Sequence, residues 1–261
     1  MIKETITLPS QGYPYRMKGN TLTVTPLTTR VYKDFIVSQG EEALLNLIDA
    51  CLVDSPIKAE DLVYQDELAV YFKIRAISMG SQLPTFSVCP HCSMQNNDTV
   101  DLMSLECNYL SLDEYPLMVT LPETGVKVGV GLPSTKLQKQ AMAEAKKRAS
   151  KFNKPTSEFY EIFLTVSILT VEGKYDLVDK YEWYCDLPLS DAIFLESAIS
   201  AIQDFGIVLS RSVVCPSCNK EYLVPLQINR SFFRESPGNF RGLEIKKGTL
   251  EKGINNTDKS E

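Results

Sequence analysis

Two Cys-Pro-x-Cys pairs constrain this sequence more than any other feature. Cys89 and Cys92 form the first pair, and Cys215 and Cys218 form the second. Two residues between cysteines let both thiolates of a tight turn point at one ion, and two such turns supply the tetrahedral four-thiolate shell that zinc prefers. The pattern therefore predicts one structural Zn²⁺ site, closed and similar to a zinc ribbon.

The separation of the two pairs determines how the chain is organised. Residues 93–214 lie between them, 122 in all. Because loop-closure entropy grows slowly with length, one metal can join segments this far apart. We expect an α+β fold, in which mixed helices and short antiparallel hairpins are joined by the split four-cysteine site. Its predicted parts are an N-terminal α+β half (1–133) with the first pair, a mainly helical half (134–235) whose pair closes one unit with the first, and a disordered tail (236–261).

Other uses of the paired cysteines stay open at this stage. Two separate disulfides require an oxidising compartment, but seven cysteines and an amino terminus without signal-peptide character favour a reducing one. A thioredoxin-like redox pair requires a Cys-x-x-Cys at a helix start in a βαβ context, which the pattern does not show. A chain that has lost its metal, or that builds the site differently, is the third alternative.

The remaining cysteines and the single histidine indicate no catalytic group. His91 lies between two predicted ligands, and we expect it to be an exposed turn residue. Catalysis by a Ser-His-Asp or Cys-His constellation needs a histidine placed against a nucleophile. Cys51, Cys107 and Cys185 are predicted to be buried structural thiols. We therefore expect a protein that is not an enzyme.

Net charge and hydropathy exclude two further classes of partner. The formal charge of −6 opposes the basic footprint of a nucleic-acid binder. No window approaches the roughly 18 consecutive apolar residues of a membrane span. Residues 136–154 are locally basic, with seven Lys or Arg against Glu144 alone. This segment is interpreted either as a solvated helix face or as a docking surface for an acidic partner.

Hydrophobic periodicity and turn residues predict the secondary structure. Helices are expected over 29–38, 41–52, 65–79, 134–150, 156–170 and 190–205, and strands over 21–24, 86–88, 99–102, 117–121, 126–132 and 207–209. Thr28 or Thr29 is predicted to cap the first helix, and Ser190-Asp191 the last. Gly80 is predicted to end the third helix.

A set of short motifs occurs in a fixed order through both halves of the chain. In the first half the motifs are Leu8-Pro9-Ser10, Val24-Thr25-Pro26-Leu27-Thr28-Thr29-Arg30, Phe72-Lys73-Ile74-Arg75-Ala76-Ile77-Ser78-Met79-Gly80, Val88-Cys89-Pro90-His91-Cys92 and Val119-Thr120-Leu121-Pro122. In the second half they are Leu187-Pro188-Leu189-Ser190-Asp191, Val214-Cys215-Pro216-Ser217-Cys218 and Ser231-Phe232-Phe233-Arg234. Taken in this order, the motifs resemble the baseplate hub and hub-assembly family of T-even-type contractile phage tails. The resemblance covers roughly residues 5 to 235. Ser93 and Asn219 stand where such cysteine knuckles usually have glycine.

The resemblance implies a viral tail protein that is made in the host bacterial cytoplasm and helps to build the baseplate hub. It implies either a hub subunit, present in the virion, or an assembly factor or chaperone that leaves. The implied partners are other baseplate hub and tape-measure proteins, with no nucleic acid and no membrane, and the oligomeric state stays open. A zinc-dependent hydrolase or thiol redox protein is one alternative. A zinc-ribbon nucleic-acid adaptor is another, for which Arg211, Lys220 and Tyr222 are few basic and aromatic residues.

Overall fold

The computed structural model describes residues 2–15, 19–38, 40–152, 159–173, 176–226, 228 and 230–233. The helices in this part of the chain are α1 (Thr29–Val37), α2 (Glu41–Cys51), α3 (Tyr64–Met79), α4 (Thr135–Phe152), α5 (Phe159–Thr165), α6 (Leu177–Cys185) and α7 (Leu189–Gln203), with 3₁₀ turns η1 (Ala59–Asp61), η2 (Leu102–Ser104) and η4 (Arg230–Phe233). The strands are β1 (Glu4–Thr7), β2 (Thr21–Val24), β3 (Gln82–Val88), β4 (Gln95–Asp101), β5 (Cys107–Asn108), β6 (Leu117–Thr120), β7 (Lys127–Val130), β8 (Ile168–Val171), β9 (Gly206–Ile207), β10 (Ser210–Val214) and β11 (Glu221–Pro225). The predicted disordered tail lies outside the described residues.

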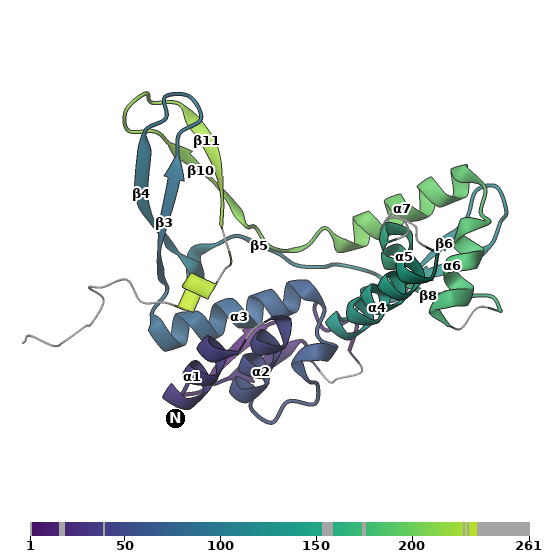
Figure 1. Ribbon diagram of the computed structural model, residues 1–261, viewed down its shortest axis with the longest axis horizontal. Helices are drawn as coiled ribbons and strands as arrows, with labels where there is room; N and C mark the ends of the chain where they lie inside the picture. The colour runs from purple at the N-terminus through teal and green to yellow at the C-terminus, as the bar shows by residue number, and fades with distance from the viewer. Residues whose placement is uncertain are drawn as a thin grey trace, which may run out of the picture.

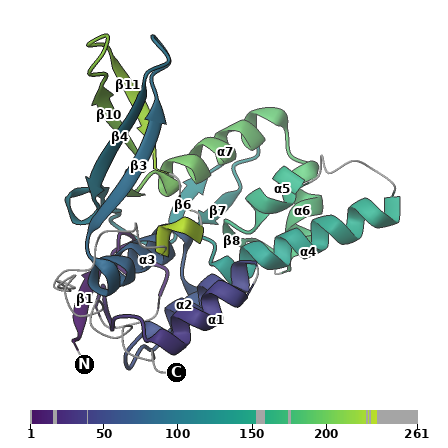
Figure 2. The same ribbon diagram turned by 60° about the vertical axis from the view of Figure 1, so that its left-hand side comes forward.

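The strands form small antiparallel sheets, and the fold is α+β as predicted. The sheets are β1–β2, β3–β4, β5–β9, β10–β11 and β6–β7–β8. Hairpins β3–β4 and β10–β11 lie side by side and project from a helical body, and we call them the arm (Figures 1 and 2). The body surrounds α3, and α4 to α7 lie on the other side of the molecule from the arm (Figure 1). None of the described helices combines the length and apolar character needed to cross a bilayer.

The centre of the body is an aromatic cluster that joins α3 to the last described turn, η4. The ring of Phe232 stacks on Tyr71 at a centroid distance of 5.0 Å, and Phe233 meets Tyr71 edge-on at 4.9 Å. Arg75 of α3 donates from Nε to the carbonyl oxygen of Phe232 at 2.7 Å. Phe232 and Phe233 are almost fully buried, so the chain returns to its N-terminal half after leaving the arm.

A buried carboxylate fixes the N-terminal segment to the start of α3. Asp66 accepts hydrogen bonds from the backbone N–H of Ser10 at 2.8 Å and from the hydroxyl of Tyr15 at 2.7 Å. The hydroxyl of Tyr15 accepts in turn from the backbone N–H of Val63 at 2.8 Å. Burial raises the pKa of Asp66, and the hydrogen bonds from Ser10 and Tyr15 oppose that shift. Nothing in the hydrophobic pattern predicted this network.

The predicted helix over 156–170 is only partly correct. α5 ends at Thr165, and Ile168–Val171 pairs with β7 as strand β8. Gly129 of β7 permits the close approach, because a Cβ there would lie 2.2 Å from Oγ1 of Thr170. The β-branched residues of this segment fill a buried sheet position, and that tertiary contact outweighs the helical spacing. α6 was not predicted at all.

The predicted helix caps are right at α1 and wrong at α7. Thr28 caps α1 by accepting from the backbone N–H of Val31. α7 begins at Leu189, so Asp191 lies inside its first turn. The carboxylate of Asp191 instead accepts from the backbone N–H groups of Glu123 and Thr124, at 2.8 and 3.0 Å, and holds the β6–β7 turn. Burial alone would raise the pKa of Asp191, but these hydrogen bonds keep it below its ordinary value.

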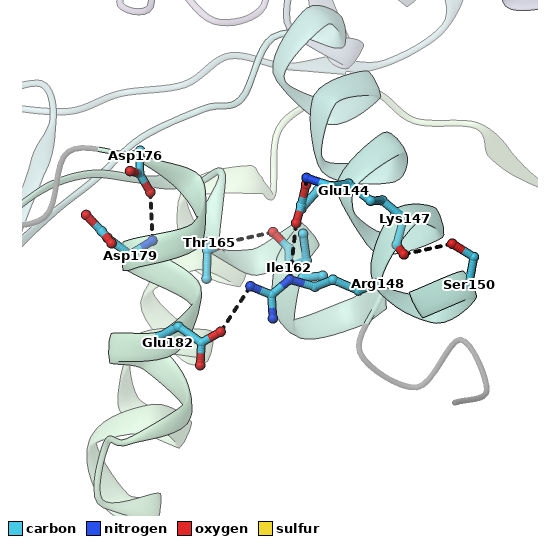
Figure 3. Close-up of polar contacts among 9 residues, drawn as sticks. All are labelled: Glu144, Lys147, Arg148, Ser150, Ile162, Thr165, Asp176, Asp179 and Glu182. Atoms are coloured by element: carbon cyan, nitrogen blue, oxygen red, sulfur yellow. Dashed lines mark hydrogen bonds and ion pairs between the residues drawn. The ribbon is translucent and has the colours of Figure 1, made fainter. Parts of the chain in front are cut away.

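Some of the basic residues of helix α4 form ion pairs with acidic residues of the same protein (Figure 3). Arg148 forms ion pairs with Glu144 at 3.3 Å and with Glu182 of α6 at 3.0 Å, and Lys147 lies 3.4 Å from Glu144. Helices α4, α5 and α6 and the residue that follows α5 share a small core of Ala141, Ala145, Ile162, Val166 and Tyr181. The ion pairs favour the interpretation of α4 as a solvated helix face. Lys154, part of the same predicted basic segment, lies outside the described residues.

Candidate metal centre

Each Cys-Pro-x-Cys pair forms the turn of one hairpin at the tip of the arm. In the first turn the backbone N–H of Cys89 donates to the carbonyl of Met94, and that of Ser93 donates to the carbonyl of Cys89, both at 2.9 Å. The second turn repeats both hydrogen bonds around Cys215 at the same distances. The internal repeat in the sequence therefore corresponds to two copies of one turn.

The residue after each second cysteine adopts the left-handed conformation that glycine favours. Ser93 has φ of 59° and Asn219 has φ of 58°. Left-handed backbone costs a residue with a side chain more than glycine, and asparagine tolerates it better than most. The knuckle geometry thus forms without the usual glycine, at some cost in conformational energy at Ser93.

Two of the distances between the four sulfur atoms match those of a tetrahedral metal shell. Sγ of Cys89 lies 3.7 Å from Sγ of Cys218, and Sγ of Cys92 lies 3.6 Å from Sγ of Cys215. All four sulfur atoms lie within 4.8 Å of one another. Four sulfurs bound to zinc at about 2.3 Å in a tetrahedron are separated by about 3.8 Å, whereas a disulfide requires about 2.05 Å. The structure therefore brings together all four cysteines that the sequence singled out, in an arrangement compatible with a metal; their role as ligands stays a prediction.

Local interactions shift the pKa values of Cys215 and Cys92 in opposite directions. Backbone N–H groups of Cys218 and Ser217 lower the pKa of Cys215 to about 6, although burial opposes them. At Cys92 the backbone N–H of Met94 lowers the pKa, but burial and the neighbouring thiols together raise it to about 11. Adjacent thiolates repel one another, so a fully deprotonated set requires a cation among the sulfur atoms.

The cluster does not include His91 or the three remaining cysteines. His91 is exposed in the first turn, as predicted. Cys51 is buried, and burial raises the pKa of its thiol to about 11, which agrees with a structural role. Cys107 is only half-buried and Cys185 is exposed, so the prediction of buried thiols is wrong for both. Cys185 is the last residue of α6. Because the sequence did not predict this helix, it could not predict that the Cys185 side chain is exposed.

Polar side chains join the two hairpins below the four-cysteine cluster. The hydroxyl of Tyr222 accepts from Nδ2 of Asn96 at 2.7 Å and lies 2.9 Å from Oγ of Ser87. Arg211 forms an ion pair with Asp98 at 2.8 Å. Sequence reasoning weighed Arg211 and Tyr222 only as contacts for nucleic acid, but both are used inside the arm. The alternation of inward and outward positions along β10 and β11 was the signal that could have shown this.

The outward positions of the arm carry exposed apolar side chains. Phe86 and Val88 are exposed on β3, and Val214 and Leu223 are exposed on β10 and β11. The inward core consists of Cys89, Cys215, Tyr222 and Val224. Each hairpin therefore presents apolar groups to solvent on the face that points away from its neighbour.

Comparison with known protein families matches residues 1–234 to the family described as T4 bacteriophage base plate protein. No curated protein and no solved structure matches the chain. The matched region contains every described helix and strand and both cysteine pairs. The chain therefore belongs to the T4 bacteriophage base plate protein family.

Proposed function

We propose that this protein acts in the baseplate hub of a contractile phage tail, as a hub subunit or as an assembly factor that helps to build the hub. Membership of the base plate family makes it a structural protein of the viral tail. In the proposal it is not an enzyme, it meets its partners in the host bacterial cytoplasm, and those partners are hub and tape-measure proteins. The observation that carries the proposal is the arm, whose two hairpins meet at the four-cysteine cluster and turn apolar faces to solvent.

The cluster in this proposal is a structural Zn²⁺ site with Cys89, Cys92, Cys215 and Cys218 as ligands. Bound zinc would supply a cross-link between the two hairpins. Four thiolates fill a tetrahedral shell and leave no position for a water molecule, as a hydrolase would need. Both pairs lie in hairpin turns and not at a helix start, which removes the context that the thiol redox alternative required.

The outer faces of the arm are the proposed contact surface. Contiguous exposed apolar patches mark sites of protein interaction, whereas apolar residues exposed singly are ordinary. Phe86 and Val88 follow one another on the same face of β3, and Leu223 lies on the outer face of the other hairpin. A partner can therefore bind either outer face of the arm without contacting the sulfur cluster.

We also propose that the predicted halves, 1–133 and 134–235, behave as one cooperative unit. β5 pairs with β9 across this division, with Cys107 opposite Ile207. The main hydrophobic core likewise contains side chains from both halves. Metal binding at the arm would add a further connection between the same two halves.

A complementation assay tests the proposal. A phage that lacks this gene is supplied with the double variant Phe86→Ser, Leu223→Ser, or with Val37→Ser as a matched control on an exposed apolar residue of α1. All variants should fold, because these side chains are exposed. We expect the arm variant to lose baseplate assembly and the control to retain it. Normal baseplates in the complete absence of the protein, or with the arm variant, would contradict the proposal.

Mass spectrometry of purified virions then separates the two forms of the proposal. A hub subunit is found in the virion in fixed ratio to other baseplate proteins. An assembly factor is required for the baseplate but absent from the virion.

A further inference from the structure

Strand β1 has one edge that pairs with β2 and one edge that is open. On the side of β2 that faces away from β1, the carbonyl of Thr23 accepts from the backbone N–H of Val53 at 2.9 Å. Thr23 lies opposite Thr5. The two residues of an antiparallel pair either exchange their backbone hydrogen bonds or both direct them outward, so Thr5 and, two residues on, Thr7 direct their N–H and C=O groups away from β2. Among the described residues, no backbone group pairs with either of them.

A cavity lies along this open edge. Beyond Thr7, the carbonyl of Pro9 accepts from the backbone N–H of Leu110 at 2.9 Å, so the segment that follows β5 closes the edge there. Towards Thr5 a cavity of about 250 Å³ lies beside the edge. Its apolar lining comes from β1, α3, the 102–105 turn and β9, and includes Ile6, Ala69, Phe72, Leu102, Leu105 and Ile207. The cavity is smaller than the roughly 300–1,000 Å³ of small-molecule sites, and so it has room for a few side chains and not for a cofactor.

An open strand edge beside an apolar cavity is the arrangement to which an added β-strand binds. Main-chain hydrogen bonds to the edge supply affinity, and alternate side chains of the added strand fill the neighbouring pocket. Successive side chains of a strand point to opposite faces. The occupant should therefore be an extended segment with apolar residues at every second position.

The chain itself continues beside this cavity. The ring of Phe72 lines the cavity and lies 4.9 Å from the ring of Phe232, measured between centroids. Phe233, the last described residue, is fully buried and meets Tyr71 of the same helix. The 28 residues 234–261 therefore begin within one side chain of the cavity. At about 3.3 Å per residue, residues 234–242 alone can span roughly 30 Å.

One part of this tail has the pattern that the cavity requires. Residues 243–246 alternate apolar and charged side chains, which is typical of a strand with one buried face, and Phe240 precedes them. The other large apolar residues of the tail, Leu250 and Ile254, stand singly. The sequence predicts that the tail forms no core of its own, because it has too few apolar residues. The apolar residues of 240–246 can be buried only on a surface that the body already provides.

We propose that residues 240–246 add to the open edge of β1 as a third strand, with Leu243 and Ile245 directed into the cavity. The backbone groups of Thr5 and Thr7 then pair with this strand in place of water. Because a short linker joins the segment to the body, its effective concentration is in the millimolar range, and a contact too weak for a separate peptide is sufficient. The added strand also covers an edge that could otherwise pair with other chains.

Amide hydrogen exchange, followed by NMR on the full chain, tests the proposal. In the unmodified protein the amides of Thr5 and Thr7 should exchange at least about tenfold more slowly than in the double variant Leu243→Ser, Ile245→Ser. The reason is that this variant loses the apolar side chains that hold the segment in the cavity, so the two outward amides return to water. The protection should be the same at about 10 μM and about 1 mM protein, because the strand and the edge belong to one chain.

Two controls accompany the measurement. The double variant Leu250→Ser, Ile254→Ser removes the same number of apolar side chains from the tail but leaves 240–246 unchanged, and it should keep the protection. The amide of Leu8 donates to the carbonyl of Asn20 at 2.8 Å beside the β1–β2 pair. Equal protection of the Leu8 amide in all three chains shows that this sheet is intact.

Each of three results would contradict the proposal. The amides of Thr5 and Thr7 could exchange as fast in the unmodified chain as in Leu243→Ser, Ile245→Ser, which would leave the edge open for a strand of a different protein. The control variant could lose the protection as fully, which would exclude a contact specific to 240–246. The protection could increase with protein concentration, which would assign the added strand to a second copy of the chain.

Discussion

Substitution of one cysteine at the tip of the arm should destabilise the whole protein, if the cluster binds zinc. Cys215 is fully buried, and its Sγ lies 3.6 Å from that of Cys92. In Cys215→Ser three thiolates remain, and a neutral hydroxyl is a poor fourth ligand for zinc. The expected result is loss of the metal, and with it loss of the cross-link between residues near 90 and residues near 215.

The size of the effect follows from the loop that the metal closes. The 122 residues between the pairs correspond to a loop-closure contribution of about 5 kcal/mol, if the metal is treated as a simple cross-link. Domains of this kind are stable by about 5–15 kcal/mol, so Cys215→Ser should leave little stability or none. Cys51→Ser places a hydroxyl in an apolar core and should cost about 1–3 kcal/mol. Cys185→Ser changes an exposed thiol and should cost almost nothing.

Urea unfolding followed by circular dichroism, together with zinc analysis by mass spectrometry, measures these differences. The unmodified protein, Cys51→Ser and Cys185→Ser should each contain one zinc per chain, and Cys215→Ser none. A strong chelator should shift the midpoint of the unmodified protein toward that of Cys215→Ser and leave that variant unchanged. Equal midpoints for Cys215→Ser and Cys185→Ser, or an unmodified protein that is stable without metal, would refute the cross-link.

Three further predictions follow from the geometry. Ser93→Gly should stabilise the zinc-loaded protein by about 0.5–1 kcal/mol in urea unfolding, because it relieves a left-handed φ, whereas Asn219→Gly should change less; the reverse order would contradict the strain at Ser93. Phe232→Ala should cost about 3–5 kcal/mol in the same assay, because the ring is buried against α3, and a cost below about 1 kcal/mol would show that η4 does not hold the core. The lowered pKa of Asp191 means that its stabilising effect is present above the ordinary value of 3.8 and is lost as pH falls through the lower folded value. Thermal melts from pH 7 to pH 3 should therefore show Asp191→Asn less stable than the unmodified protein at pH 7 and a narrowing gap below about pH 4; a constant gap would contradict the assignment.

Sequence patterns correctly predicted helix ends and turns that depend on residues close together in the chain. The helix ending at Gly80 was predicted to begin at residue 65 and begins at Tyr64, and Gly80 has the expected positive φ of 89°. The hairpin turn at Gly125 was likewise recognised from its turn residues, and φ there is 69°. The four cysteines were found because a Cys-x-x-Cys turn carries its chemistry in its own spacing.

Features that depend on distant partners could not be predicted in this way. Asp191 resembles a helix cap in the sequence, but Glu123 and Thr124 lie close enough in space to take its hydrogen bonds. Ile168–Val171 has helical spacing, yet Gly129 opens a place for it beside β7. In both cases a contact over roughly forty to seventy residues outweighed a local preference, and such contacts leave no periodic signal.

The construction of the arm connects the proposed metal with the proposed binding role. A two-stranded hairpin is at best marginally stable in water, and the inward core of the arm is small, with Tyr222 and Val224 as its main apolar side chains besides the cysteines. Apolar packing in so small a core is not sufficient to fix the position of one hairpin relative to the other. A body that needed only stability would gain more from burying Phe86 and Leu223 than from exposing them on a projection. We infer that the cross-link maintains the shape of the arm so that these apolar faces stay available to a partner.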